Sequence, residues 1–143
     1  MVSVRRTFTV SKPIETVVDY LSDFANASSW DPGTKTCTPL QKGPVAVGST
    51  WRNVSVFRGK EQELTYKLVT REPGHLVFEG TNKTVTSTDD MTFTSVAGGT
   101  SVNYLANIEF HGLIKLFGWV AKGEFEKLGD KVEEQMPRVL NAL

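Results

Sequence analysis

The last part of the chain carries one apolar face and one charged face, as an amphipathic helix does. Apolar residues recur at steps of three or four positions, at Ala121, Phe125, Leu128, Val132, Met136, Val139 and Leu143. This spacing keeps one side of an α-helix apolar, because a turn contains roughly 3.6 residues. We therefore predict one helix over residues 121–142. Pro137 should kink it, since proline removes a backbone hydrogen bond.

Most of the preceding chain alternates apolar and polar residues, which is typical of strands with one buried face. The alternating or apolar segments cover residues 2–10, 34–40, 50–57, 64–68, 76–78, 85–94 and 102–110, and glycine-containing turns separate several of them. Two places leave the register open. Arg6 interrupts the apolar face of the first segment, and in residues 50–58 two alternating sets compete for the inner face.

These elements together predict an α+β fold. Two short helices should follow the first strand, over residues 14–22 and 24–29, before a turn at residues 30–33. Consecutive strands joined by short turns form an antiparallel meander, and only one large helix is available to cover it. We expect a curved antiparallel sheet of six to seven strands gripping the long C-terminal helix. The 143 residues fit a single domain, residues 1–143.

Composition narrows the function classes. Lys plus Arg equals Asp plus Glu at 16 each, which argues against a nucleic-acid partner. The single cysteine, Cys37, excludes an internal disulfide and a multi-cysteine metal site. No apolar run approaches the ~18 residues of a membrane span, and the N-terminus alternates instead of forming a signal peptide. We expect a cytoplasmic protein without metal or cofactor, either monomeric or homodimeric.

Catalytic motifs are missing from the sequence. It contains no glycine-rich phosphate loop, no His-Glu-x-x-His motif and no Gly-x-Ser-x-Gly. His75 and His111 lie beside turns, and we interpret Cys37 as an inert buried thiol. Asp89 and Asp90 are adjacent in a strand, so they point to opposite faces and cannot act together. We interpret both as solvated charges. Asn103 and Asn107 share one strand face with Glu109, so we place both asparagines on the outside of the sheet.

Three stretches carry a resemblance to a known family. They are residues 13–23 followed by Trp30-Asp31-Pro32, residues 66–80, and residues 98–104 followed by Gly112 and the long helix. With the order of the elements, they resemble the START-like superfamily (SRPBCC, helix-grip fold), in its polyketide cyclase/dehydrase and lipid-transport branch. The resemblance implies a hydrophobic small molecule held between sheet and helix. It also leaves open a polyketide cyclase/dehydratase-like enzyme for an aromatic substrate, and a lipid or quinone chaperone.

Large apolar side chains are then the candidates for ligand contact, with plain core packing as the alternative. We expect the ligand-binding set to be Trp30, Trp51, Tyr66, Phe78, Met91, Tyr104, Ile108, Phe117, Phe125 and Leu128. The hydroxyls of the two tyrosines, Tyr66 and Tyr104, would need hydrogen-bond partners in an apolar space, and a ligand or a trapped water could supply them. Residues 113–120 form a separate apolar run, which could be a lid, a weak membrane contact or the start of the helix.

Overall fold

The structure, a computed structural model, describes residues 1–112 and 122–143. Its strands are β1 (Val2–Val10), β2 (Thr34–Pro39), β3 (Thr50–Phe57), β4 (Lys60–Glu72), β5 (His75–Thr81), β6 (Val85–Val96) and β7 (Gly99–Phe110). Its helices are α1 (Ile14–Ser22), the 3-10 turn η1 (Phe24–Asn26), α2 (Ala27–Trp30) and α3 (Lys122–Asn141). The strands form one antiparallel seven-stranded sheet in the order β1-β7-β6-β5-β4-β3-β2. The predicted α+β helix-grip fold is confirmed.

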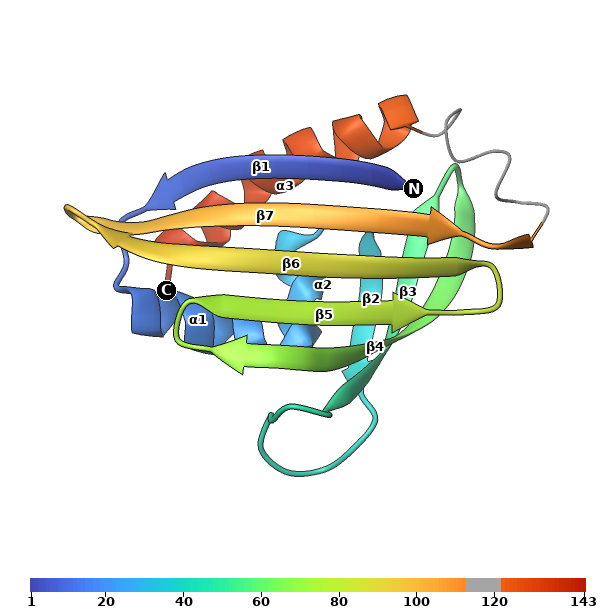
Figure 1. The fold of residues 1–143 in the computed structure, drawn as a ribbon, viewed down its shortest axis with the longest axis horizontal. Helices are drawn as coiled ribbons and strands as arrows, with labels where there is room; N and C mark the ends of the chain where they lie inside the picture. Colours follow the sequence, from blue (N-terminus) through green and yellow to red (C-terminus); the bar gives the residue numbers. More distant parts are fainter. Residues whose placement is uncertain (113–121) are drawn as a thin grey trace.

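The helices cover one face of the sheet. Figure 1 shows α3 running behind β1 and β7, while α1 and α2 lie lower in this view, with α2 behind β5 and β6. Strand β4 is longer than the alternating core at residues 64–68 predicted. A two-residue turn at Arg58 and Gly59, both at positive φ, joins β3 to β4. Such turns match the natural twist of a hairpin.

The structure shows which residues of β3 and β1 point to the inner face, at the two places where the sequence left the register open. Trp51 and Asn53 of β3 are buried, whereas Arg52 is exposed. Arg6 of β1 also points inward, where its guanidinium pairs with Glu126 and Asp130 of α3 at 2.8 Å each. The charged residue in the apolar face of β1 therefore ties the edge of the sheet to the helix.

Helix α3 lies within the predicted range and continues through Pro137. Its buried residues are Gly129, Val132, Met136 and Leu140. The sequence instead predicted Val139 and Leu143 for the last turn, but Leu143 is exposed. The reason is that Leu140 lies one turn beyond Met136 on the same face and the helix ends at Asn141. The kink at Pro137 stays a prediction.

Close approach of α3 to the sheet depends on one glycine. A Cβ atom at Gly129 would lie 2.4 Å from Cγ1 of Val4, so a larger residue would push the helix away from β1. The apolar run at residues 113–120, including Phe117, lies outside the described residues, so its three alternatives stay open.

Candidate ligand-binding cavity

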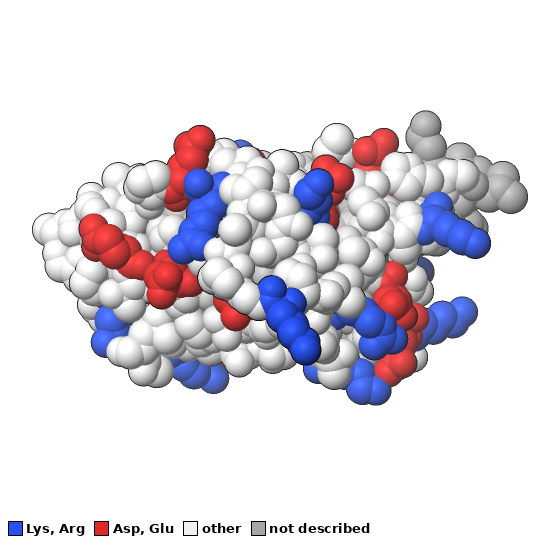
Figure 2. Space-filling model, turned by 90° about the horizontal axis from the view of Figure 1, so that it is seen from below, with Lys and Arg blue, Asp and Glu red and all other residues white. Residues whose placement is uncertain are grey.

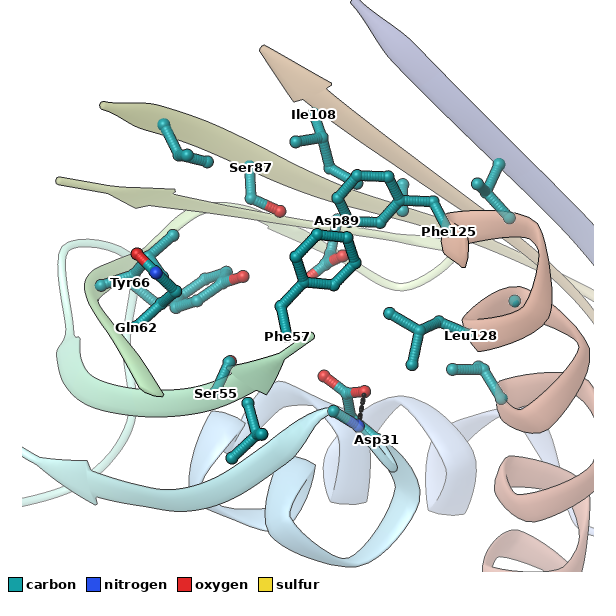
Figure 3. Close-up of a pocket in the computed structure, with 18 of the residues that line it drawn as sticks. Asp31, Ser55, Phe57, Gln62, Tyr66, Ser87, Asp89, Ile108, Phe125 and Leu128 are labelled. Carbon is teal, nitrogen blue, oxygen red and sulfur yellow. Dashed lines mark hydrogen bonds between the residues drawn. The ribbon is translucent and has the colours of Figure 1, made fainter. Parts of the chain in front are cut away.

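A cavity of about 470 Å³ lies between the inner face of the sheet and the first turns of α3. Its apolar wall comes from alternating positions of the strands and from one face of α3. Among the residues that form this wall are Val4, Leu64, Ala106, Ile108, Leu128 and Val132. Figure 3 shows side chains from both layers pointing into the same space. Strand alternation and helix periodicity thus produce one shared apolar pocket.

Aromatic rings from the β3–β4 hairpin and from α3 meet at one side of the cavity. The rings of Phe57 and Phe125 are stacked, with centroids 4.7 Å apart and an interplanar angle of 5°. Phe110 of β7 lies against Phe125 at 6.1 Å. Next to this stack, Arg58 Nε donates to Glu124 Oε2 at 2.5 Å. The hairpin and the helix therefore touch where the cavity meets the surface.

Asp89 of β6 places a carboxyl group on the inner side of the cavity. The residue is 5% exposed, and its Oδ1 accepts a hydrogen bond from the Tyr104 hydroxyl at 2.9 Å. Burial raises the pKa of Asp89 to about 7, the nearby Asp31 carboxylate adds to the rise, and the Tyr104 hydrogen bond opposes it. The Asp89 carboxyl group therefore titrates near neutral pH.

Asp31 supplies a second carboxyl group from the segment after α2. Its Oδ1 accepts from the Gly33 backbone N–H at 2.9 Å, and its Oδ2 accepts from the Thr34 hydroxyl at 2.9 Å. Burial raises the pKa of Asp31, and these two donors oppose that rise. In Figure 3, Asp31 and Asp89 face the cavity from opposite layers. Two carboxyl groups with different partners thus share one apolar space.

Tyr66 of β4 brings a hydroxyl group to the same region. Its ring covers Gly80 of β5, where a Cβ atom would lie 2.5 Å from the ring. The glycine therefore lets the ring lie against the sheet, and the hydroxyl points into the cavity (Figure 3). Burial, together with the charge of Asp89, raises the pKa of Tyr66 well above its ordinary value. The phenol stays protonated at neutral pH.

The structure divides the predicted ligand-binding residues into two groups. Tyr66, Tyr104, Ile108, Phe125 and Leu128 line the cavity. The others that are described have no exposed surface and lie in the packed core instead of on the cavity wall: Trp30, Trp51, Phe78 and Met91. Phe24 of η1 contributes to this difference, because its ring packs against three of these core residues, with centroids 4.5 Å from Phe78, 5.9 Å from Trp30 and 6.2 Å from Trp51. Ligand contact by the lining residues stays a prediction.

Asp31, Asp89 and Phe57 are cavity residues that the sequence analysis did not select. The interpretation of Asp89 as a solvated charge was wrong, whereas its orientation opposite to Asp90 is confirmed. Asp90 is half-exposed and lies 2.7 Å from His75 Nε2, on the outer face. A signal was present in the sequence, because Asp89 has the same parity as the apolar residues Met91 and Phe93 of β6.

The structure also places the cysteine and the two asparagines that the sequence analysis considered. Burial raises the pKa of Cys37 to about 11, so its thiol is protonated at neutral pH. Asn103 and Asn107 lie on the outer face as predicted, where they bond Thr7 and Ser3. Among residues 1–112 and 122–143, no group of three His, Cys, Asp or Glu side chains is placed to hold a metal ion.

The described surface is mixed in charge. On the face shown in Figure 2, acidic and basic side chains are interspersed without a continuous patch of one sign. No helix in the described ranges has both the length and the apolar character needed to cross a membrane.

Comparisons with solved structures agree on the fold. The protein TTHA0849 from Thermus thermophilus is 17% identical, with a TM-score of 0.76 over 98% of this chain and 94% of that one. A START superfamily protein from Mycobacterium smegmatis is 17% identical, with a TM-score of 0.72 over the same shares of both chains. The di-domain ARO/CYC protein StfQ of the steffimycin biosynthetic pathway is 12% identical, with a TM-score of 0.74 over 99% of this chain and 49% of its own.

At the level of sequence, no functionally curated protein matches the chain. The family described as "Polyketide cyclase / dehydrase and lipid transport" does match, over residues 1–139. This match covers nearly the whole chain and agrees with the START-like neighbours in structure. The chain therefore belongs to the polyketide cyclase/dehydrase and lipid transport family.

Proposed function

We propose that the protein binds a hydrophobic or aromatic small molecule between the sheet and α3. The observation that carries the proposal is the apolar cavity of about 470 Å³ with a few polar groups at its inner side. Sites for small molecules are typically ~300–1,000 Å³, mostly apolar, and contain a small number of polar groups that fix orientation. The family and fold support the same class of function.

The cavity would hold the two ends of such a ligand differently. Stacked rings at Phe57 and Phe125 suit a flat apolar group, because aromatic faces pack well against one another. Asp31, Asp89 and Tyr66 would receive a polar group at the inner side. The ligand expected from this arrangement is amphipathic, with one apolar body and one short polar end.

Binding can be tested with Nile red, a neutral hydrophobic dye whose fluorescence rises in apolar surroundings. Ala106→Phe adds a ring inside the cavity and should weaken dye binding about tenfold or more. Asn107→Phe adds the same ring on the outer face and serves as the matched control. Equal dye binding by both variants would contradict the proposed site. If dye binding differs between the two variants as expected, native mass spectrometry of protein purified from its own host would identify the natural ligand.

An enzymatic function of the cyclase/dehydratase type is the second candidate, and one observation favours it. Asp89 exchanges its proton near neutral pH, while Asp31 receives two donors that favour its charged form. Such a pair could act as acid and base on a bound substrate. The enzymatic function would be supported if the protein turned over an aromatic polyketide and lost this activity in Asp89→Asn but kept it in Asp90→Asn. The lipid-chaperone alternative depends on residues outside the described ranges.

A further inference from the structure

We propose that the ligand carries a protonated amine, which binds between Asp31 and Asp89 while its hydrophobic body fills the rest of the cavity. This proposal rests on the proposed binding function and adds the chemical class of the ligand. It depends on three features of the cavity: the charge of its inner side, the unused hydrogen-bonding groups there, and the apolar wall around them.

The first feature is acidic charge without a described counterion. Asp31 and Asp89 both face the cavity, and the charge of Asp31 helps to raise the pKa of Asp89. Two cationic residues line the cavity: Arg58 pairs with Glu124, and Lys60 lies at the first position of β4 without an ion pair to either aspartate. Arg6 pairs with Glu126 and Asp130. No ion pair joins either aspartate to a Lys or Arg of the described chain. A ligand cation would supply the missing compensation, because buried charges need a partner.

The second feature is a set of polar atoms with spare acceptor capacity that point into the cavity. Asp89 Oδ1 accepts from Tyr104, but Oδ2 receives no hydrogen bond from any described group. The Tyr66 hydroxyl lies beside Ser87 and can still accept a hydrogen bond, since a hydroxyl oxygen has two lone pairs. A primary ammonium has three N–H donors and no acceptor. Its donors match the acceptors offered by Asp31, Asp89 and Tyr66.

The third feature is the apolar wall, which makes this end of the cavity selective. A ligand carboxylate or phosphate would bring a third negative charge beside two carboxyl groups in apolar surroundings, which is strongly unfavourable. A ligand alcohol could form a hydrogen bond there but would leave the acidic charge uncompensated. An amine forms hydrogen bonds and also compensates the acidic charge, so the cavity should prefer it to a neutral or anionic molecule of the same shape.

The test is isothermal titration calorimetry with three probes that share one ring system: naphthylmethylamine, naphthylmethanol and naphthoic acid. The amine should bind about 10- to 100-fold more tightly than the alcohol, as a charge-assisted hydrogen bond does relative to a neutral one. The acid should bind more weakly than the alcohol. Equal affinities for amine and alcohol, or tighter binding of the acid, would overturn the proposal.

Three variants assign the preference to the two carboxyl groups. Asp89→Asn keeps an oxygen for the Tyr104 hydroxyl and should abolish most of the preference for the amine while it retains binding of the alcohol. Asp31→Asn should reduce the preference in the same way. Asp90→Asn removes the neighbouring charge on the outer face and should leave all three affinities unchanged. Retained alcohol binding shows that each variant is folded with its cavity intact.

The pH dependence provides an independent readout. The titratable groups that face Asp89 are Asp31, Tyr66 and Tyr104, and burial raises the pKa of both tyrosines, so they stay protonated in the tested range. Between about pH 6 and about pH 8 the alkylammonium remains charged, as that of lysine does, while Asp89 ionises. Amine binding should therefore tighten with rising pH, and alcohol binding should not. An amine affinity that does not change with pH would contradict the role of Asp89.

The experiment separates this inference from the function on which it rests. If none of the probes and no Nile red binds, the proposed binding function fails. If the alcohol and Nile red bind but the amine has no advantage, the cavity binds hydrophobic molecules and only the amine inference fails. A preference that persists in both Asp31→Asn and Asp89→Asn would place the amine elsewhere and would also overturn the inference.

Discussion

The interior has two ends that share one sheet but are filled differently. At one end the rings of Phe24, Trp51 and Phe78 lie within 6.2 Å of one another, and their side chains are almost completely buried. At the other end, the same inner face of the sheet lines a cavity of about 470 Å³ under the start of α3. Both ends are rich in aromatic residues, so aromatic content alone does not distinguish a core from a binding site.

The difference arises from the helices that cover each end. The short segment η1–α2 inserts two large rings, Phe24 and Trp30, into the inner face. Helix α3 instead crosses β1 at Gly129, and Phe125 and Leu128 only border the space beneath it. The acidic pair Asp31 and Asp89 lies in the cavity between the two layers. A sheet residue is therefore core or cavity wall according to what packs over it.

The largest effect should come from truncation at the packed end. Trp51→Ala should lower the free energy of unfolding by about 3–5 kcal/mol, because it leaves a large void and removes the indole hydrogen bond to Asp23. Phe125→Ala should cost only about 1–2 kcal/mol, because its ring is half-buried and already borders empty space. Urea denaturation measures both values. Similar costs would mean that the two ends are packed alike.

The next effect concerns the pH dependence of stability. The pKa of Asp89 rises from 3.8 to about 7 on folding, so the folded protein binds more protons than the unfolded chain between those values. Its contribution to stability therefore falls as pH rises from about 4 to about 7, by up to about 1.4 kcal/mol per pH unit. Asp89→Asn should become progressively more stable than the wild type over this range.

Asp90→Asn is the control for that measurement, because Asp90 lies on the outer face beside His75. Thermal or urea melts across the pH range should show no comparable gain for this variant. A difference between wild type and Asp89→Asn that is constant with pH would show that Asp89 titrates normally.

A smaller effect should follow from the contact that positions α3. Gly129→Ala should destabilise the protein by about 1–3 kcal/mol, because its Cβ atom would collide with Val4 and the helix must move. Gly123→Ala, in the same helix with no atom of the described residues within 4 Å of the added Cβ, should be neutral or slightly stabilising. Paired melts of the two variants decide the matter, and a neutral Gly129→Ala would mean that the helix shifts freely over the cavity.

The smallest effect is expected at the aromatic contact beside the cavity. Phe57→Ala should cost about 1 kcal/mol, since it removes one stacked ring pair from a half-buried site. The same change should speed dissociation of naphthylmethanol, because loss of the ring leaves a gap between the hairpin and α3. Stopped-flow measurement of dissociation gives the rate. An unchanged rate would show that the ligand leaves by another route.

Local sequence patterns were enough to predict the elements and their order. Alternation placed the strands of the meander, and helical spacing located α3 to within a residue or two, because these periods are properties of local backbone geometry. It also assigned Asn103 and Asn107 to the outer face by parity. The resemblance then indicated the family, which the family match over residues 1–139 confirms.

Which inward residues face empty space depends on how the helices pack on the sheet, and local patterns do not reveal that packing. Trp51 and Tyr66 are paired neighbours on β3 and β4 and share the inner face, yet one is sealed in the core and the other lines the cavity. Parity cannot separate them, because the difference depends on where Phe24 inserts and where Gly129 brings α3 close to the sheet. The same holds for Asp31 and Asp89, which are 58 positions apart in sequence and meet across the cavity only when helix and sheet are assembled.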